Sequence, residues 1–122
     1  MKTWRALRRR ILTPDISQTR LAVRGFHVKN DEAKERLETI GRTFLTGYAY
    51  AAEARGAADA EPALETIPAA FRGFGYEGAA MAMAVRDALP GGGRHVAELL
   101  AGRGDRHVYM AYVGIGWAMA RL

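Results

Sequence analysis

Apolar residues recur every three or four positions through much of this chain, and that spacing restricts the folds it can adopt. The longest series lies within residues 30–55 and comprises Leu37, Ile40, Phe44, Tyr48 and Ala51. A period near 3.6 residues places such side chains on one face of an α-helix. No segment shows the alternation typical of a half-buried strand. We therefore expect an all-α fold, an irregular multi-helix bundle of about five to six helices with Gly/Pro-rich loops.

Helix-breaking residues divide the rest of the sequence. Three of the four prolines are Pro14, Pro68 and Pro90, and the last of them precedes three consecutive glycines. Proline steers the preceding residue out of the α region and glycine adds backbone freedom, so these positions predict helix ends and loops. We expect helices over about residues 1–12, 30–55, 59–66, 79–89, 94–101 and 105–122. Segment 71–78 contains three aromatic residues and three glycines, which we interpret as a tight entry into the helix that follows.

The last predicted helix is the most apolar part of the chain. Its thirteen residues from Val108 to Ala120 carry no charge. A membrane crossing needs about 20 such residues, so we interpret this segment as a buried helix. Large side chains keep a 4-3-4-3 spacing at Val108, Tyr112, Ile115, Met119 and Leu122, and small ones lie beside them at Ala111, Gly114 and Ala118. Because small residues allow close helix approach, we expect this helix to pack against the glycine- and aromatic-rich middle of the chain.

Length and charge suggest one domain with a basic N-terminal part. A chain of 122 residues fits a single helical domain spanning residues 1–122. Residues 1–29 carry eight cations and one anion, whereas residues 30–122 carry ten cations and twelve anions. We therefore separate residues 1–29 as a basic N-terminal helix and connection. Arginines interrupt its apolar pattern, so it has no signal-peptide core, and we expect a cytoplasmic protein.

Chemistry-bearing residues are few. The absence of cysteine excludes disulfides, thiolate metal sites and cysteine nucleophiles. The three histidines lack metal-ligand spacing, so neither a metal nor a cofactor is expected. Candidate proton-transfer residues are Tyr76, Glu77 and His107. Glu77 is the central one, because it lies among aromatic and tightly turned residues that would raise its pKa. The alternative interpretation of Glu77 is an acidic first-turn residue favoured by the helix dipole.

Two further patterns suggest binding sites. Gly73, Gly75 and Gly78 match the spacing of a dinucleotide-binding loop, but no strand-like segment precedes them, so we do not assign that site. Four arginines are candidates for contact with an anionic membrane surface, with an adjacent tryptophan as anchor: Arg5, Arg8, Arg9 and Arg10. The alternative is that this basic helix docks on the rest of the protein. Aromatic residues elsewhere are not interleaved with Lys and Arg, so nucleic acid is not expected as a partner.

Four stretches of sequence carry a resemblance to a known family. They are residues 4–12 (WRALRRRIL), 24–27 (RGFH), 72–81 (RGFGYEGAAM), and 107–110 (HVYM) followed by 116–122 (GWAMARL). In this order they resemble the start of an actinobacterial family encoded beside enediyne polyketide synthases. The resemblance implies a helical, cytosolic protein accessory to assembly of the enediyne core. It also implies that this chain is the N-terminal third of a longer protein, whose C-terminal portion would be a further packing partner.

Three functions follow as expectations. The first is an accessory protein that binds a polyene intermediate or a polyketide biosynthesis enzyme, because an apolar cleft suits a flat conjugated chain. Its candidate ligand-binding residues are Phe71, Phe74, Tyr76 and Tyr112. The second is an enzyme that tailors the enediyne core by proton transfer through Tyr76, Glu77 and His107. The third is a membrane-surface adaptor working through the N-terminal arginines.

Overall fold

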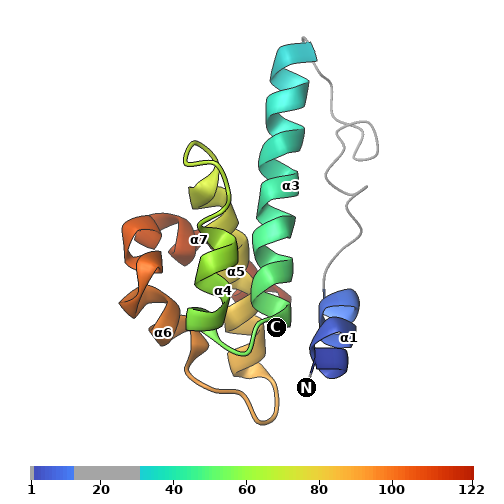
Figure 1. The fold of residues 1–122 in the computed structure, drawn as a ribbon, viewed down its shortest axis with the longest axis vertical. Coiled ribbons are helices and arrows are strands. Elements are labelled where there is room, and N and C mark those ends of the chain that lie inside the picture. The colour runs from blue at the N-terminus through green and yellow to red at the C-terminus, as the bar shows by residue number, and fades with distance from the viewer. Residues whose placement is uncertain (1, 13–30) are drawn as a thin grey trace.

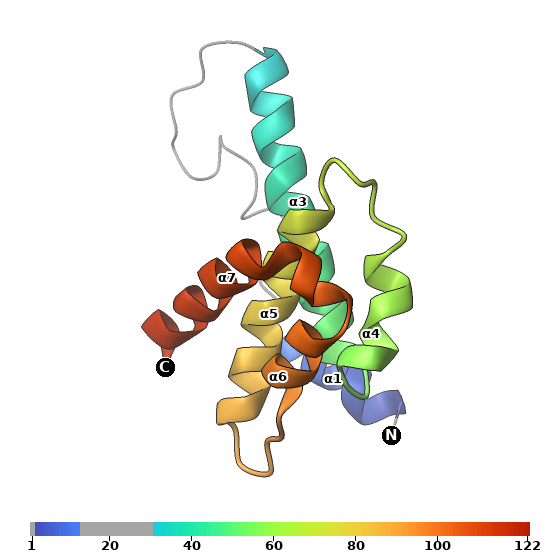
Figure 2. The ribbon, with the colours of Figure 1, turned by 90° about the vertical axis from the view of Figure 1, so that its left-hand side faces the viewer.

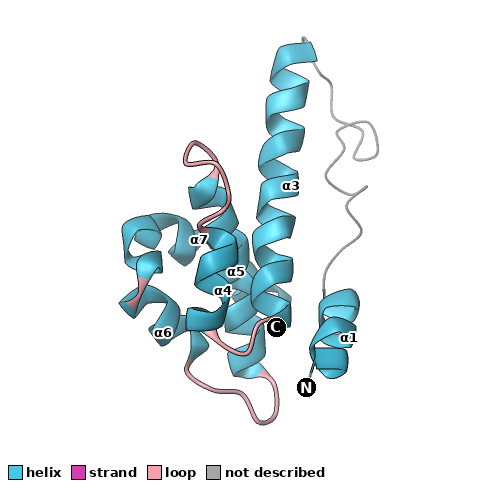
Figure 3. Cartoon of the chain, in the orientation of Figure 1, coloured by secondary structure: helices cyan, strands magenta, loops and turns pink. Residues whose placement is uncertain are grey.

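The computed structural model describes residues 2–12 and 31–122, which form helices joined by short loops (Figures 1 and 3). In chain order these are α1 (Lys2–Leu12), α3 (Asp31–Glu53), α4 (Ala57–Leu64), α5 (Arg72–Ala88), α6 (His95–Ala101), the short 3-10 helix η2 (Arg103–His107) and α7 (Val108–Arg121). No strand occurs within these two ranges, which confirms the all-α prediction. The predicted connection at residues 15–29 lies outside the described residues.

Helix α5 is the centre of the bundle, and α3 packs along one of its sides. Glycines form the contact: a side chain on Gly47 would overlap the backbone of Gly75, and one on Gly78 would overlap the carbonyl of Phe44. Backbones can touch in this way only where no Cβ intervenes. The core around this contact is made largely of alanine, together with Tyr48, Tyr76 and Met83. The N-terminal half of α3 extends beyond the other helices (Figure 1).

Helix α7 crosses another side of α5 (Figure 2). The crossing point is Gly114, where a side chain would overlap the carbonyl oxygen of Glu77 and come within 3.1 Å of the Met81 nitrogen. The glycine- and aromatic-rich middle and the apolar C-terminal segment are therefore two helices in contact, as predicted.

Helix α7 was predicted to be buried, but only its small-residue face is. Its small residues Ala111, Gly114 and Ala118 are buried, whereas Tyr112 and Met119 of the predicted large-residue stripe are 60% and 70% exposed. The prediction of a buried helix is therefore wrong for these large residues. Contact with the α5 backbone at Gly114 leaves too little space between the two helices for large side chains, so these point away.

Some predicted helix boundaries also differ. Segment 71–78 is not an entry to a helix but its first two turns, because α5 begins at Arg72 with Phe71 at the N-cap. Two of its glycines, Gly75 and Gly78, serve the contact with α3 instead of a turn, and Gly73 lies near Met110 and His107. Helix α4 begins at Ala57, two residues before the predicted start. The last helix begins three residues later than predicted, because the residues from Asp105 to His107 belong to η2.

Candidate functional site

A tyrosine, a carboxylate and an imidazole meet where α4, α5 and η2 come together. Tyr76 of α5 has no exposed surface, and its hydroxyl donates a hydrogen bond of 2.8 Å to Oε2 of Glu65, just past the end of α4. Its ring stacks on the imidazole of His107, the last residue of η2, with ring centroids 4.7 Å apart and planes inclined by 18°. We refer to Glu65, Tyr76 and His107 as the tyrosine cluster.

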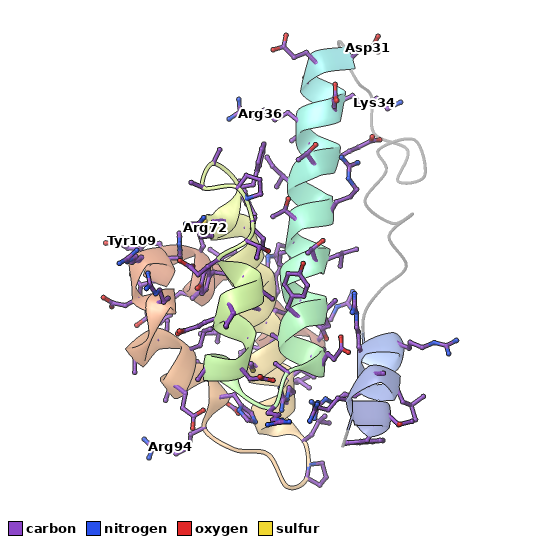
Figure 4. All side chains as sticks on the ribbon, in the orientation of Figure 1. Asp31, Lys34, Arg36, Arg72, Arg94 and Tyr109 are labelled. Atoms are coloured by element: carbon purple, nitrogen blue, oxygen red, sulfur yellow. The ribbon has the colours of Figure 1, made fainter. Side chains whose placement is uncertain are left out.

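Two arginines surround the carboxylate of the tyrosine cluster. Arg72 and Arg103 place Nη1 atoms 3.8 Å and 3.7 Å from Oε1 of Glu65. Arg72 also donates to the carbonyl oxygens of Glu65 and Ile67, both at 3.1 Å, and so satisfies acceptors at the end of α4. Figure 4 shows Arg72 at the same edge of the molecule as Tyr109, the second residue of α7. The Glu65 charge is thus balanced by Arg72, which also holds α5 on the end of α4, and by Arg103 of η2.

Burial sets the protonation of the two rings. It raises the pKa of Tyr76, and the hydrogen bond to Glu65 raises it further, so the phenol keeps its proton. Burial lowers the pKa of His107 below its ordinary value of 6.5, against the opposing effect of the Glu65 charge. Near neutral pH the cluster therefore contains a phenol that donates to a carboxylate and an uncharged imidazole. Proton transfer to a substrate would require access, which Tyr76 lacks.

Glu77 lies next to the tyrosine cluster in sequence but has different surroundings. Its carbonyl oxygen faces Gly114 of α7, and its side chain is half-buried. Burial raises the pKa of this carboxyl. Within the described parts of the chain it makes no hydrogen bond or ion pair. Of the three predicted proton-transfer residues, the structure brings Tyr76 and His107 into contact.

Sequence reasoning missed Glu65 as the carboxylate beside Tyr76. The two residues are eleven positions apart on different helices, so no helical spacing links them. No sequence pattern identifies this pair, because the contact depends on how α4 packs against α5.

A family model described as a protein of unknown function, DUF1702, matches residues 3–122. The chain belongs to the DUF1702 family. No curated protein and no solved structure matches it.

The outer side of α7 in this DUF1702 chain is an exposed apolar surface. We define the α7 aromatic face by its large exposed residues, which are Tyr109, Tyr112, Val113, Trp117 and Met119. Tyr109 is 84% and Trp117 is 57% exposed, and no charged residue lies between Val108 and Ala120. Solvent-facing apolar side chains that gather on one helix face indicate a binding surface more strongly than the same residues scattered singly.

The four residues predicted to bind a ligand fall into different environments of the DUF1702 fold. Tyr112 belongs to the α7 aromatic face, Phe71 and Phe74 are half-buried at the start of α5, and Tyr76 is enclosed in the core. An open pocket of about 260 Å³ lies elsewhere, lined by Arg94, Ala97, Glu98 and Ala101. Figure 4 shows Arg94 and Tyr109 well apart. Tyr112 is therefore the most accessible residue of the four.

Two of the four N-terminal arginines hold α1 on the end of α3. Arg8 donates to the carbonyl oxygens of Ala52 and Ala54, and Arg9 pairs with Glu53 at 2.8 Å. Cations bonded to the last carbonyls of a helix also match the negative end of its dipole. The predicted docking of the basic helix on the rest of the protein accounts for these two side chains.

A third arginine, Arg86 of α5, completes this end of α3 from inside the protein. It is 7% exposed and donates to the carbonyl oxygens of Ala51 at 2.7 Å, Ala54 at 2.8 Å and Arg55 at 3.0 Å. Burial, and then the charge of Arg8, lower the pKa of Arg86 to about 10. Arg8 and Arg86 thus share one acceptor, the carbonyl oxygen of Ala54.

Two other kinds of site are absent from the described residues. Within residues 2–12 and 31–122 no group of three His, Asp or Glu side chains is placed to hold a metal ion. None of the helices that the structure describes has the length and apolar character needed to cross a membrane.

Proposed function

We propose that this chain is a noncatalytic accessory protein of enediyne polyketide biosynthesis that binds a conjugated polyene intermediate on the α7 aromatic face. One observation carries the binding role: three aromatic rings and a methionine are exposed together on a helix surface without charge. A conjugated polyene is flat and apolar, so it can stack on such rings and cover surface that water otherwise contacts. The pathway comes from the sequence resemblance described above.

The tyrosine cluster supports a structural role better than a catalytic one. Tyr76 is enclosed and its proton is engaged by Glu65, whose charge two arginines balance. A catalytic acid or base must come within hydrogen-bond reach of the group that it protonates or deprotonates. A substrate could reach Tyr76 only if α4 or η2 moved away from α5. The cluster is therefore assigned to holding these three elements together.

Binding is tested with cis-parinaric acid, a conjugated tetraene whose emission rises in apolar surroundings. We expect saturable binding to the wild-type chain and energy transfer from Trp117 to the bound tetraene. The double variant Tyr112→Ser/Trp117→Ser is expected to bind at least about tenfold more weakly, which corresponds to about 1.4 kcal/mol. Saturated palmitic acid should compete poorly if the flat conjugated chain is what the rings recognise.

The matched control is Leu37→Ser, which removes an apolar side chain that is also about half exposed but lies on α3. It is expected to bind the tetraene like the wild type. Equal affinity of the double variant and the wild type, or no binding by the wild type, would refute the proposal.

The proton-transfer alternative has one observation in its favour, the stacking of Tyr76 on His107. It predicts that the absorbance of a conjugated polyene incubated with the protein changes with time, and that Tyr76→Phe and His107→Gln abolish the change. The binding proposal predicts a spectrum that stays constant after mixing.

A further inference from the structure

Gly116 of α7 has no explanation within the described parts of the chain. Four other helical glycines, Gly47, Gly75, Gly78 and Gly114, each leave room for a neighbouring group, and three of them let helix backbones touch. A Cβ added at Gly116 would meet no atom within 4 Å. Glycine weakens a helix interior relative to alanine, so a glycine here has a cost that no internal contact offsets.

The surroundings of Gly116 suit a second helix. On a helical wheel Gly116 lies at the centre of the α7 aromatic face, with Val113 and Ala120 on the same side. All three are small or medium-sized, and larger rings flank them. A helix that packs there must itself be uncharged and must carry a small residue at the crossing. Residues 108–120 of α7 meet both conditions, so a second copy of the chain can supply the partner.

We propose that two copies pair their α7 helices antiparallel about a twofold axis at Gly116, and that the pair closes the polyene site. The inference rests on the function proposed above. In this arrangement Tyr112 of one copy lies beside the partner's Ala120, so a large ring faces a small residue. Tyr109 lies beside the partner's Leu122, which is also exposed. Each end of the paired helices thereby becomes a slot with tyrosines on one wall and aliphatic side chains on the other.

A single helix face covers only one side of a flat ligand, which is why the second copy matters. Ligand sites usually bury ~70–90% of the ligand surface, and this requires walls on more than one side. The exposed area is also sufficient for pairing. Each aromatic side chain buries ~150–250 Å² when covered, so the face with its aliphatic neighbours approaches the ~800 Å² per partner of a standard interface.

Charge is consistent with this pairing. Each copy carries a formal net charge of +5, but the contact surface carries none, so no like charges meet directly. The remaining repulsion acts over a longer distance and is screened by salt. Pairing is therefore expected to become stronger as salt concentration rises, opposite to the behaviour of binding to an anionic surface.

The test is the solution mass of the full chain, measured by sedimentation and by light scattering. We expect twice the 13.3 kDa mass of one chain for the wild type. Gly116→Leu should be monomeric but folded, because Gly116 is exposed and a Cβ there meets no atom within 4 Å. Ala58→Leu adds the same bulk at an exposed position of α4 and should remain dimeric. Gly116→Leu should also bind cis-parinaric acid at least about tenfold more weakly than wild type, although its Tyr112 and Trp117 are intact.

The outcomes separate this inference from the proposed function. A monomeric wild type that binds the tetraene through Tyr112 and Trp117 would overturn the pairing and leave the proposed function standing. A Gly116→Leu variant that stays dimeric would also overturn it. A dimer that dissociates in Gly116→Leu but binds no tetraene would support the pairing and refute both the proposed function and the closed site.

Discussion

Two glycines of α7, two positions apart, should respond oppositely to the same substitution. Gly114 touches the backbone of α5 at Glu77, whereas Gly116 faces open space. Alanine favours a helix interior over glycine by about 1 kcal/mol. Gly116→Ala should therefore raise the free energy of unfolding by about 1 kcal/mol, because the added methyl group meets no atom.

At Gly114 the same gain is outweighed by overlap. The new Cβ would overlap a carbonyl oxygen, which cannot rotate aside as the end of a side chain could. Overpacking typically costs about 1–3 kcal/mol, and we take the upper end because the obstacle is backbone. After subtracting the helix gain, Gly114→Ala should lower the free energy of unfolding by about 2 kcal/mol. The two variants should thus differ by about 3 kcal/mol.

Urea unfolding followed by far-UV circular dichroism measures both changes. In a thermal melt of a domain of this size, 1 kcal/mol would correspond to a shift in Tm of about 4 °C. Protein concentration must be low enough that all variants are monomeric, because pairing of copies would add to the apparent stability. If Gly114→Ala were as stable as the wild type, α5 and α7 would not cross at this glycine. The α7 aromatic face would then no longer be expected to point into solvent.

Three further substitutions test titratable side chains whose pKa is shifted by burial. Arg86→Met should lower the free energy of unfolding by about 3 kcal/mol in urea titrations, because the carbonyl oxygens of Ala51 and Arg55 lose their side-chain donor and that of Ala54 keeps only Arg8. The pKa of Glu77 is raised in the folded chain, so the free energy of unfolding of the wild type should fall as the pH rises from 4.5 through the folded-state pKa. Glu77→Gln should remove this pH dependence and should be more stable than the wild type at neutral pH. His107 has a lowered folded-state pKa, so wild-type stability should fall as the pH drops from 6.5 through that value; His107→Gln should lack this loss.

Each of these three substitutions has an outcome that would contradict the role given to the side chain. An Arg86→Met variant as stable as wild type would mean that water replaces the lost donor. Stability profiles of Glu77→Gln or His107→Gln that run parallel to the wild type over the stated ranges would show that these side chains titrate alike in the folded and unfolded chain.

Most helices were predictable because their signals are local. The spacing of Leu37, Ile40 and Phe44 depends only on neighbours three or four positions away, and Pro68 or Pro90 acts on the adjacent turn. The glycines at 73, 75 and 78 misled the prediction of the α5 boundary for the same reason. Local reasoning associates clustered glycines with a turn, whereas here two of them provide close contacts around a continuous helix.

The sites depended on contacts between helices. Spacing alone left two possible inner faces for α7, one large and one small, and the backbone contact at Gly114 selected the small one. No spacing joined Tyr76 to Glu65 or Arg8 to the carbonyl of Ala54. The local sequence therefore specifies which segments are helical, since helix formation is a property of neighbouring residues. Which side chains are buried, paired or exposed was decided by tertiary structure, since burial depends on the surface that another helix brings.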